Sequence, residues 1–260
     1  MKINIILLTI FICICFYFFN NQLKNEYFSN NNKINVYFID KNQLIDILKK
    51  DNDNYYKSFF QNDLNARKIS SIEEYYDYID NSISNFTIEE KEKILRCIKI
   101  ANEKIYNIKL DWFNGLKANE IDWKIGCMSG KLYENGLPHT RNDIILISKD
   151  YLKNNDIRII KTLIHEKVHI YQKIYSDDTE KFIKYYNYTI IKKKDINDNV
   201  RANPDLNNFI YKDKNNNVNK AVYNINPINI EDIVYYPINN QSYEHPYEKM
   251  AIDIENYEKT

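Results

Sequence analysis

The pentad His-Glu-Lys-Val-His at residues 165–169 constrains this 260-residue chain more than any other feature. Asn155 or Asp156 can cap a helix that begins shortly before it. Apolar residues then recur at helical spacing, at Ile157, Ile160, Ile164 and Val168. Because residues four apart on a helix lie one above the other, His165 and His169 can present two imidazoles to one metal ion. The sequence therefore predicts a helix with a metal site on one face.

Glu166 is rotated by about 100° around such a helix from His165, so it can reach a metal-bound water without binding the metal itself. Zinc polarises such a water, and a neighbouring carboxylate takes its proton as the water attacks a carbonyl carbon. The chain has only four histidines, which makes a chance match to this spacing rare. We expect Zn²⁺ bound by His165 and His169 with Glu166 as the general base. The alternative is an amphipathic helix whose histidines are merely exposed or hydrogen-bonded.

The region before the pentad divides into a helical part and a part rich in turns. Residues 35–84 have a helical pattern, with Asp40 as one cap and Ser71-x-x-Glu74 as a capping box. Thr87-x-x-Glu90 is a second capping box and predicts a long amphipathic helix after it.

All four glycines and both tryptophans fall within residues 111–148, which indicates several tight turns. That stretch ends in Ile144–Ile147, a β-branched run that predicts a strand. Further along the chain, Phe209–Tyr211 and Val218–Tyr223 flank a polar tip and predict a hairpin. Between the pentad and this hairpin, Arg201 and Asp205 are more typical of a turn held by a salt bridge than of a substrate contact.

The amino-terminal segment predicts a membrane anchor. Residues 3–19 are apolar except for Asn4 and Thr9, which is long enough for a bilayer span of about 17–25 residues. A cleaved signal peptide is the alternative, but no small residue follows the run. Lysines flank the run on both sides, so its orientation is undetermined. The expected organisation is an anchor at 1–20, a tether at 21–34, a helical region at 35–85 and a further domain at 86–260.

The charge balance excludes one class of partner. The chain has 36 Lys and Arg against 36 Asp and Glu, a formal net charge of zero. A dedicated nucleic-acid-binding protein needs an excess of basic residues to displace counterions from phosphates. We therefore expect no nucleic acid among the partners, whereas the apolar amino-terminal segment predicts a membrane as one of them.

With its HExxH helix, the sequence resembles the zincin metallopeptidases. That resemblance implies a small sheet whose edge strand, before the helix, pairs with an extended peptide substrate. Residues 136–148 suit this strand, and the resemblance makes His139 and Thr140 candidate substrate-binding residues. The chain is similar to uncharacterised zincin-like proteins of large DNA viruses over roughly residues 86–260, although HExxH is the only specific sequence motif in this resemblance. Lys167 departs from the family, which has an uncharged residue there, and we expect it on a solvent-exposed edge of the helix.

The third metal ligand distinguishes the branches of that family. Gln172 and Tyr175 stand where a metzincin has glycine and histidine, and Thr189 stands where a thermolysin-like glutamate is expected. Near the carboxyl end, Pro246 suits the first position of a helix, with Glu248 in its first turn. The spacing from Glu248 to a small residue at Ala251 resembles the third-ligand helix of gluzincins. Glu248 is the expected third ligand, and the two residues left as alternatives are Glu244 and His245.

These expectations combine into one description. The fold class is α+β, a zincin-like catalytic domain with a small sheet, an HExxH helix and a C-terminal ligand helix, preceded by a helical region and a membrane anchor. The expected function is a membrane-anchored zinc metallopeptidase that hydrolyses peptide bonds. The alternative is a catalytically inactive zincin-fold module that mediates interactions at a membrane.

Overall fold

The computed structural model describes residues 34–238 and 243–258 of the chain. The expected anchor, and the tether up to residue 33, lie outside these ranges. From Val36 onward the chain forms one compact unit of mixed α and β structure. No helix within the described ranges is both long and apolar enough to cross a bilayer.

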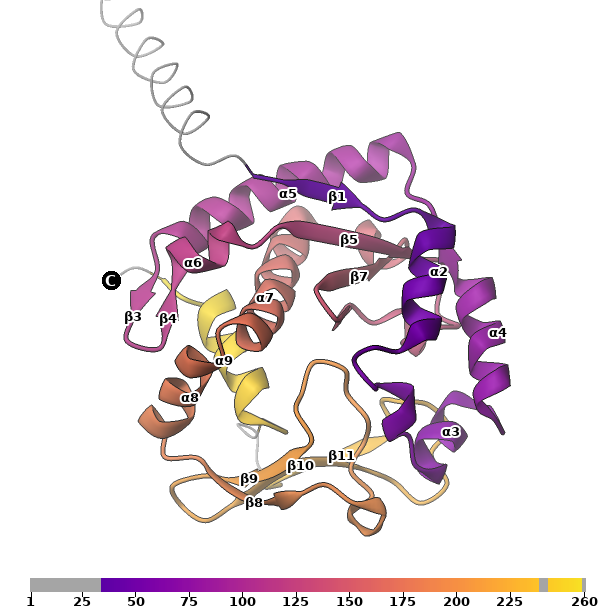
Figure 1. The fold of residues 1–260 in the computed structure, drawn as a ribbon, viewed down its shortest axis with the longest axis vertical. Helices are drawn as coiled ribbons and strands as arrows, with labels where there is room; N and C mark the ends of the chain where they lie inside the picture. The colour runs from indigo at the N-terminus through magenta and orange to yellow at the C-terminus, as the bar shows by residue number, and fades with distance from the viewer. Residues whose placement is uncertain (1–33, 239–242, 259–260) are drawn as a thin grey trace, which may run out of the picture. The chain divides into compact units, whose positions relative to one another are not determined.

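A mixed sheet lies at the centre of this unit (Figure 1). Its strands, in spatial order, are β1 (Val36–Phe38), β5 (Trp123–Met128), β7 (Ile144–Ser148) and β6 (His139–Arg141). Both β1 and β7 run parallel to β5, whereas β6 runs antiparallel to β7 and forms an edge of the sheet. The short strand β2 (Ile83–Ser84) pairs antiparallel with one end of β5. The strand predicted at residues 144–147 is confirmed, and every residue of β7 is buried.

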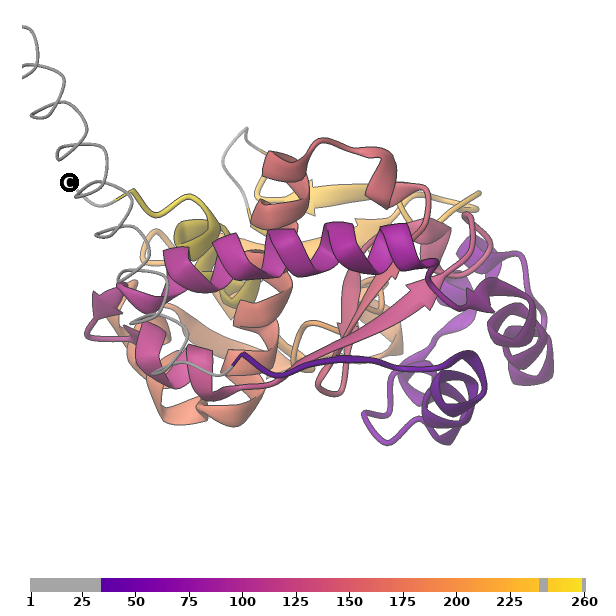
Figure 2. The same ribbon diagram turned by 90° about the horizontal axis from the view of Figure 1, so that it is seen from above.

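Helices cover both faces of this sheet. On one face lie α2 (Lys41–Lys50), α3 (Gln61–Arg67) and α4 (Ile72–Ser82), and Leu44 and Leu48 share a core with Met128 and Leu146. Gly126 of β5 permits this packing, because a Cβ there would lie 2.7 Å from a methyl group of Leu44. The other face carries α5 (Ile88–Tyr106), whose Asn102 accepts a hydrogen bond of 3.1 Å from Nε1 of Trp123. Figure 2 shows α5 running along the sheet.

The predicted helix starts are confirmed at three positions. Asp40 caps α2, Ser71 caps α4, and Thr87 and Glu90 form a reciprocal capping box at α5. The helical interpretation of residues 35–84 is wrong at its two ends, which form β1 and β2. These strands have three and two residues, too few for a periodic signal, and they form because β5 supplies their hydrogen-bond partners.

A second, antiparallel sheet lies apart from the first (Figure 1). Its order is β11 (Ile233–Tyr236), β10 (Val218–Tyr223), β9 (Phe209–Lys212) and β8 (Thr189–Lys193). The predicted hairpin is confirmed as β9 and β10, and the Asp213 carboxylate stabilises its tip by accepting from the backbone N–H groups of Asn215 and Asn217.

The remaining helices include those that carry the candidate site. They are α7 (Asp156–Ile174), α8 (Ser176–Tyr185) and α9 (Pro246–Glu255). A small hairpin of β3 (Lys109–Leu110) and β4 (Phe113–Asn114) leads into α6 (Gly115–Glu120). Single 3₁₀ turns occur at Tyr56–Ser58, Glu134–Gly136, Tyr151–Lys153 and Ile196–Asp198.

A buried ion pair joins α3 to the segment before β6. Arg67 Nη2 lies 2.7 Å from Glu134 Oε2, and the hydroxyl of Tyr75 donates to Glu134 Oε1 at 2.7 Å. Burial by itself would raise the pKa of Glu134, but the charge and hydrogen bonds of Arg67 lower it to about 2. Glu134 is therefore ionised within the protein interior, and its charge depends on Arg67 for compensation.

Candidate metal centre

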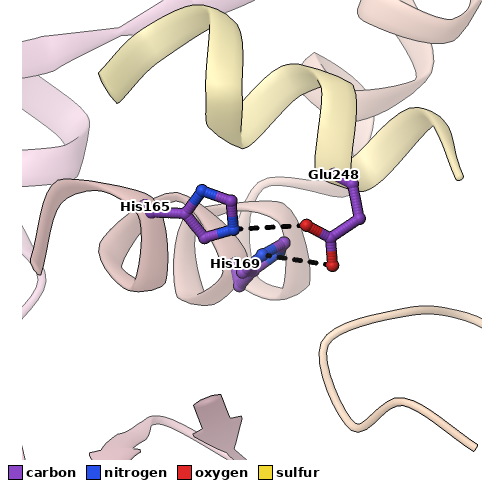
Figure 3. A group of neighbouring side chains, drawn as sticks. All are labelled: His165, His169 and Glu248. Atoms are coloured by element: carbon purple, nitrogen blue, oxygen red, sulfur yellow. Dashed lines mark ion pairs between the residues drawn. The ribbon is translucent and has the colours of Figure 1, made fainter. Parts of the chain in front are cut away.

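Two helices bring the candidate ligands together. Asn155 caps α7 by accepting a hydrogen bond of 2.9 Å from the backbone N–H of Arg158, as the sequence predicts. Pro246 is in the first turn of α9, as predicted, α9 packs on α7, and Ala251 of α9 is buried. In Figure 3, the histidines of α7 and Glu248 of α9 point toward one another across this helix contact.

The distances suit one metal ion. His165 Nε2 lies 3.2 Å from Glu248 Oε2, and His169 Nε2 lies 3.9 Å from Glu248 Oε1. One donor atom from each of these three side chains lies within 4.8 Å of the other two. Two imidazole nitrogens and one carboxylate are the ligand set of an open catalytic zinc site.

His169 provides an independent test of whether a metal fits. Gln172 donates its amide N–H to the backbone oxygen of Tyr247 at 2.9 Å, which leaves Gln172 Oε1 to accept from His169 Nδ1 at 3.0 Å. His169 Nε2 must then carry a lone pair. This nitrogen is buried and has no hydrogen-bond partner among the described residues. A buried acceptor left without a partner costs about 1–3 kcal/mol, and a bound cation would remove that cost.

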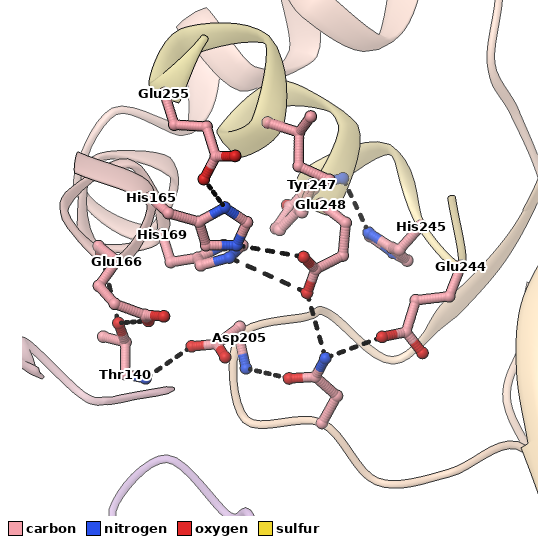
Figure 4. Close-up of polar contacts among 12 residues, drawn as sticks. Thr140, His165, Glu166, His169, Asp205, Glu244, His245, Tyr247, Glu248 and Glu255 are labelled. Atoms are coloured by element: carbon pink, nitrogen blue, oxygen red, sulfur yellow. Dashed lines mark hydrogen bonds and ion pairs between the residues drawn. The ribbon is translucent and has the colours of Figure 1, made fainter. Parts of the chain in front are cut away.

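The other histidine is oriented in the same way. Oε2 of Glu255 lies 3.0 Å from Nδ1 of His165, which leaves Nε2 directed toward Glu248 (Figure 4). Carboxylate or amide partners of this kind fix the ring orientation of metal-binding histidines. The sequence reasoning missed both Glu255 and Gln172. Helical spacing could have indicated both residues as partners of the histidines, because Glu255 lies two helical turns after Glu248 and Gln172 lies one turn after His169.

The charged groups of this cluster alter one another's pKa values. Burial opposes the charged form of His165, but the hydrogen bonds that it donates to Glu248 and Glu255 raise its pKa well above the ordinary value. Burial likewise opposes ionisation of Glu248, but the hydrogen bond with His165 and the nearby histidine charges lower its pKa. The ionised carboxylate of Glu248 therefore stabilises a positive charge at this position.

Glu166 lies beside the three candidate ligands and is not one of them. Its side chain is buried and accepts a hydrogen bond of 2.9 Å from the hydroxyl of Thr140 (Figure 4). Burial, followed by the nearby charge of Asp205, raises the pKa of Glu166 to about 8. A carboxyl group with a pKa near neutrality is suited to accept and return a proton.

The two alternative third ligands point elsewhere. Glu244 accepts hydrogen bonds from Arg201 Nε at 3.0 Å and from Arg201 Nη2. His245 caps α9 through Nδ1, and its Nε2 contacts Asn207 Oδ1 at 3.0 Å. Arg201 thus forms a salt bridge, as expected, but its partner is Glu244, which lies outside the 201–205 turn.

The prediction that Lys167 is solvent-exposed is wrong. Its side chain is 1% exposed, and its Nζ donates to the backbone oxygens of Ile121 and Asp122 and lies 4.3 Å from the ring centre of Trp123. Burial lowers the pKa of Lys167 to about 7. The amphipathic pattern of α7 did not reveal this, because a second face of the helix is also covered by protein.

A cavity of about 360 Å³ opens onto the cluster. His139, His165, Glu166, Asp205 and Glu248 are among its lining residues. His139, a candidate for substrate binding, is buried, and its Nδ1 contacts the backbone oxygen of Leu137 at 2.8 Å. A substrate that enters this cavity would therefore lie between α7, α9 and the 201–205 turn.

Thr140, the other candidate for substrate binding, has its backbone groups engaged already. Its N–H donates to Asp205 Oδ1 at 2.8 Å, and its carbonyl oxygen accepts from Nζ of Lys173 at 3.3 Å. An extended peptide could pair with this residue of β6 only by displacing those two side chains.

The chain was compared with protein-family models, with curated proteins and with solved structures, and none of the three comparisons found a match.

Proposed function

We propose that this chain is a zinc-dependent metallopeptidase of the zincin type, in its gluzincin branch. The observation that carries the proposal is the convergence of His165, His169 and Glu248 at one cavity, with Glu166 beside them. The order of elements, with an edge strand before the HExxH helix and a ligand helix near the carboxyl end, agrees with that family. The apolar segment at residues 3–19 would anchor the enzyme in a membrane.

In this proposal His165, His169 and Glu248 hold the metal. Bound zinc supplies Lewis acidity, which polarises a carbonyl group and acidifies water. Glu166 would take a proton from the water that attacks the peptide carbonyl carbon, and would return it to the amine that leaves when the C–N bond breaks. Glu255 and Gln172 keep the two imidazoles oriented for binding, while the buried walls of the cavity limit access of bulk water.

The alternative is an inactive module that keeps a metal for stability and mediates interactions at a membrane. The presence of Glu166 favours the enzymatic function, because a purely structural site has no use for a buried carboxyl group whose pKa is about 8 beside the ligands. If the metal only stabilised the fold, an apolar residue at this position would serve equally well.

One experiment distinguishes the two functions. The full chain, purified in detergent, is analysed for metal and incubated with casein and a peptide library. If the chain is an enzyme, the wild type should bind one zinc per chain and cleave these substrates. The Glu166→Gln variant should then retain zinc but lose turnover. Zinc without cleavage by the wild type would favour the interaction module. A folded protein that takes up no zinc would contradict both.

A further inference from the structure

Thr140 directs every one of its polar groups toward residues outside its own sheet. Its hydroxyl donates to Glu166 Oε2 at 2.9 Å and also lies 3.3 Å from the backbone oxygen of Glu166. Its N–H donates to Asp205 Oδ1 at 2.8 Å, and its carbonyl oxygen accepts from Lys173. The residue is completely buried. Figure 4 shows Thr140 between Glu166 and Asp205. It is therefore held in place from three directions.

The hydroxyl of Thr140 is well placed to set the direction of the Glu166 carboxylate. No other side chain among the described residues hydrogen-bonds to this carboxylate, and Oε1 of Glu166 is left free. Glu166 also lines the cavity that the ligands border. A carboxylate held by one oxygen presents the other in a defined direction, whereas an unheld carboxylate samples several rotamers.

Asp205 in turn holds Thr140, although it lies far away in the sequence. The backbone N–H of Asp205 donates to Oδ1 of Asn203 at 3.0 Å. Asn203 Nδ2 lies 3.2 Å from Glu248 Oε1 and 3.0 Å from Glu244 Oε1. The 201–205 turn thus connects the ligand helix to the edge strand, and the carboxylate of Asp205 takes the N–H that a neighbouring strand would otherwise use.

We propose that Thr140 is a positioning residue that aims the Glu166 carboxylate, and that Asp205 holds Thr140 in the orientation needed for this contact. The inference deepens the proposed peptidase function and rests on it for its kinetic consequence. It replaces the expectation that Thr140 binds the substrate backbone. Recognition of the substrate then depends on side chains that line the cavity and not on strand pairing at Thr140.

The first test measures structure and does not require catalytic activity. By NMR, the amide proton of Thr140 should exchange slowly in the wild type and in Asp205→Asn, whose side-chain oxygen still accepts, and at least about tenfold faster in Asp205→Ala. In crystal structures, the Glu166 carboxylate should move or become disordered in Thr140→Val and keep its place in Thr140→Ser. An ordered, unmoved carboxylate in Thr140→Val would overturn the proposal even if the wild type had no peptidase activity.

The second test measures the kinetics of cleavage with a peptide that the wild type cleaves. Thr140→Val should lower kcat about tenfold or more with KM changed by less than about twofold, because the hydrogen bond that holds the Glu166 carboxyl group in place is lost. Thr140→Ser should restore most of kcat. Thr179→Val is the matched control, since Thr179 is a buried threonine whose hydroxyl contacts only the backbone oxygens of Gln172 and Tyr175.

Two kinetic outcomes would contradict the proposal. A rise in KM with unchanged kcat in Thr140→Val would assign Thr140 to substrate binding. Equal losses in the valine and serine variants would mean that packing, and not the hydroxyl, is what matters. Absence of cleavage by the wild type would instead count against the peptidase function, and the structural test would still decide the role of Thr140.

Discussion

His165 Nε2 lies 3.2 Å from Oε2 of Glu248, and this contact joins the middle of α7 to the first turn of α9. It is the shortest of the contacts between the histidines and the third candidate ligand. The pair depends on the packing of two helices that are separated by the whole second sheet in the sequence. The contact between His165 and Glu248 therefore exists only in the folded chain. Each residue of the cluster can be tested separately.

Glu248→Ala should weaken zinc binding by more than about a hundredfold, because only two histidines would remain as protein ligands. The measurement is zinc content after dialysis against a weak chelator of known affinity. Glu244→Ala is the control. It removes the partner of Arg201 and should lower stability, yet zinc should be retained. Loss of zinc in Glu244→Ala with retention in Glu248→Ala would reverse the assignment.

Glu255→Gln should reduce zinc affinity about 10–100-fold without unfolding the protein, because Glu255 orients the ring of His165 through Nδ1. Competition titration with a fluorescent zinc chelator measures this change. Asp253→Asn is a matched control on the same helix, since Asp253 pairs with Lys249 and contacts neither histidine. Equal affinities for Glu255→Gln and the wild type would show that the contact has no role in metal binding.

Glu134→Gln should destabilise the protein at pH 7 by about 3 kcal/mol, because Arg67 would lose the nearer of its two buried carboxylate partners. The pKa of Glu134 falls from 4.5 to about 2 on folding, so its contribution to stability is complete above pH 4.5 and decreases as the pH falls toward 2. The difference in the free energy of unfolding between wild type and variant should therefore shrink over this range. Urea unfolding at several pH values measures it, and a difference that does not depend on pH would contradict the prediction.

Residues 1–20 should remain attached to the protein and hold it in a membrane, since the apolar run at 3–19 is not followed by a small-residue cleavage site. Membranes from expressing cells should retain the protein after washing with alkaline carbonate. Release by this wash, or a mature amino terminus near residue 20, would exclude an anchor. Deletion of residues 1–20 provides the control, because the shortened chain should no longer sediment with membranes.

Local signals in the sequence predicted most of what lies within single elements. The helix of the pentad, its Asn155 cap, the capping box at Thr87 and the proline start of α9 all occur as expected. At Ser71 only the serine cap occurs as expected, because the Glu74 carboxylate accepts from the backbone N–H of Ser70 and not from that of Ser71. The face of α7 that carries His165 and His169 follows from helical geometry alone, because four-residue spacing places two side chains on one side. Glu248 was selected by its helical context, and the structure places it beside both histidines.

Tertiary contacts decided the rest. The short strands β1 and β2 exist because β5 offers them hydrogen-bond partners, which no local pattern reveals. Lys167 is buried because α7 is covered on more than one face, so its side chain meets two backbone carbonyls and Trp123 in place of water. The sequence by itself determined that His165 and His169 share one face of a helix, since spacing on one helix is a local property. Only the folded chain decided how Thr140, Glu166 and Asp205 meet, because their hydrogen bonds join three segments that are far apart in the sequence.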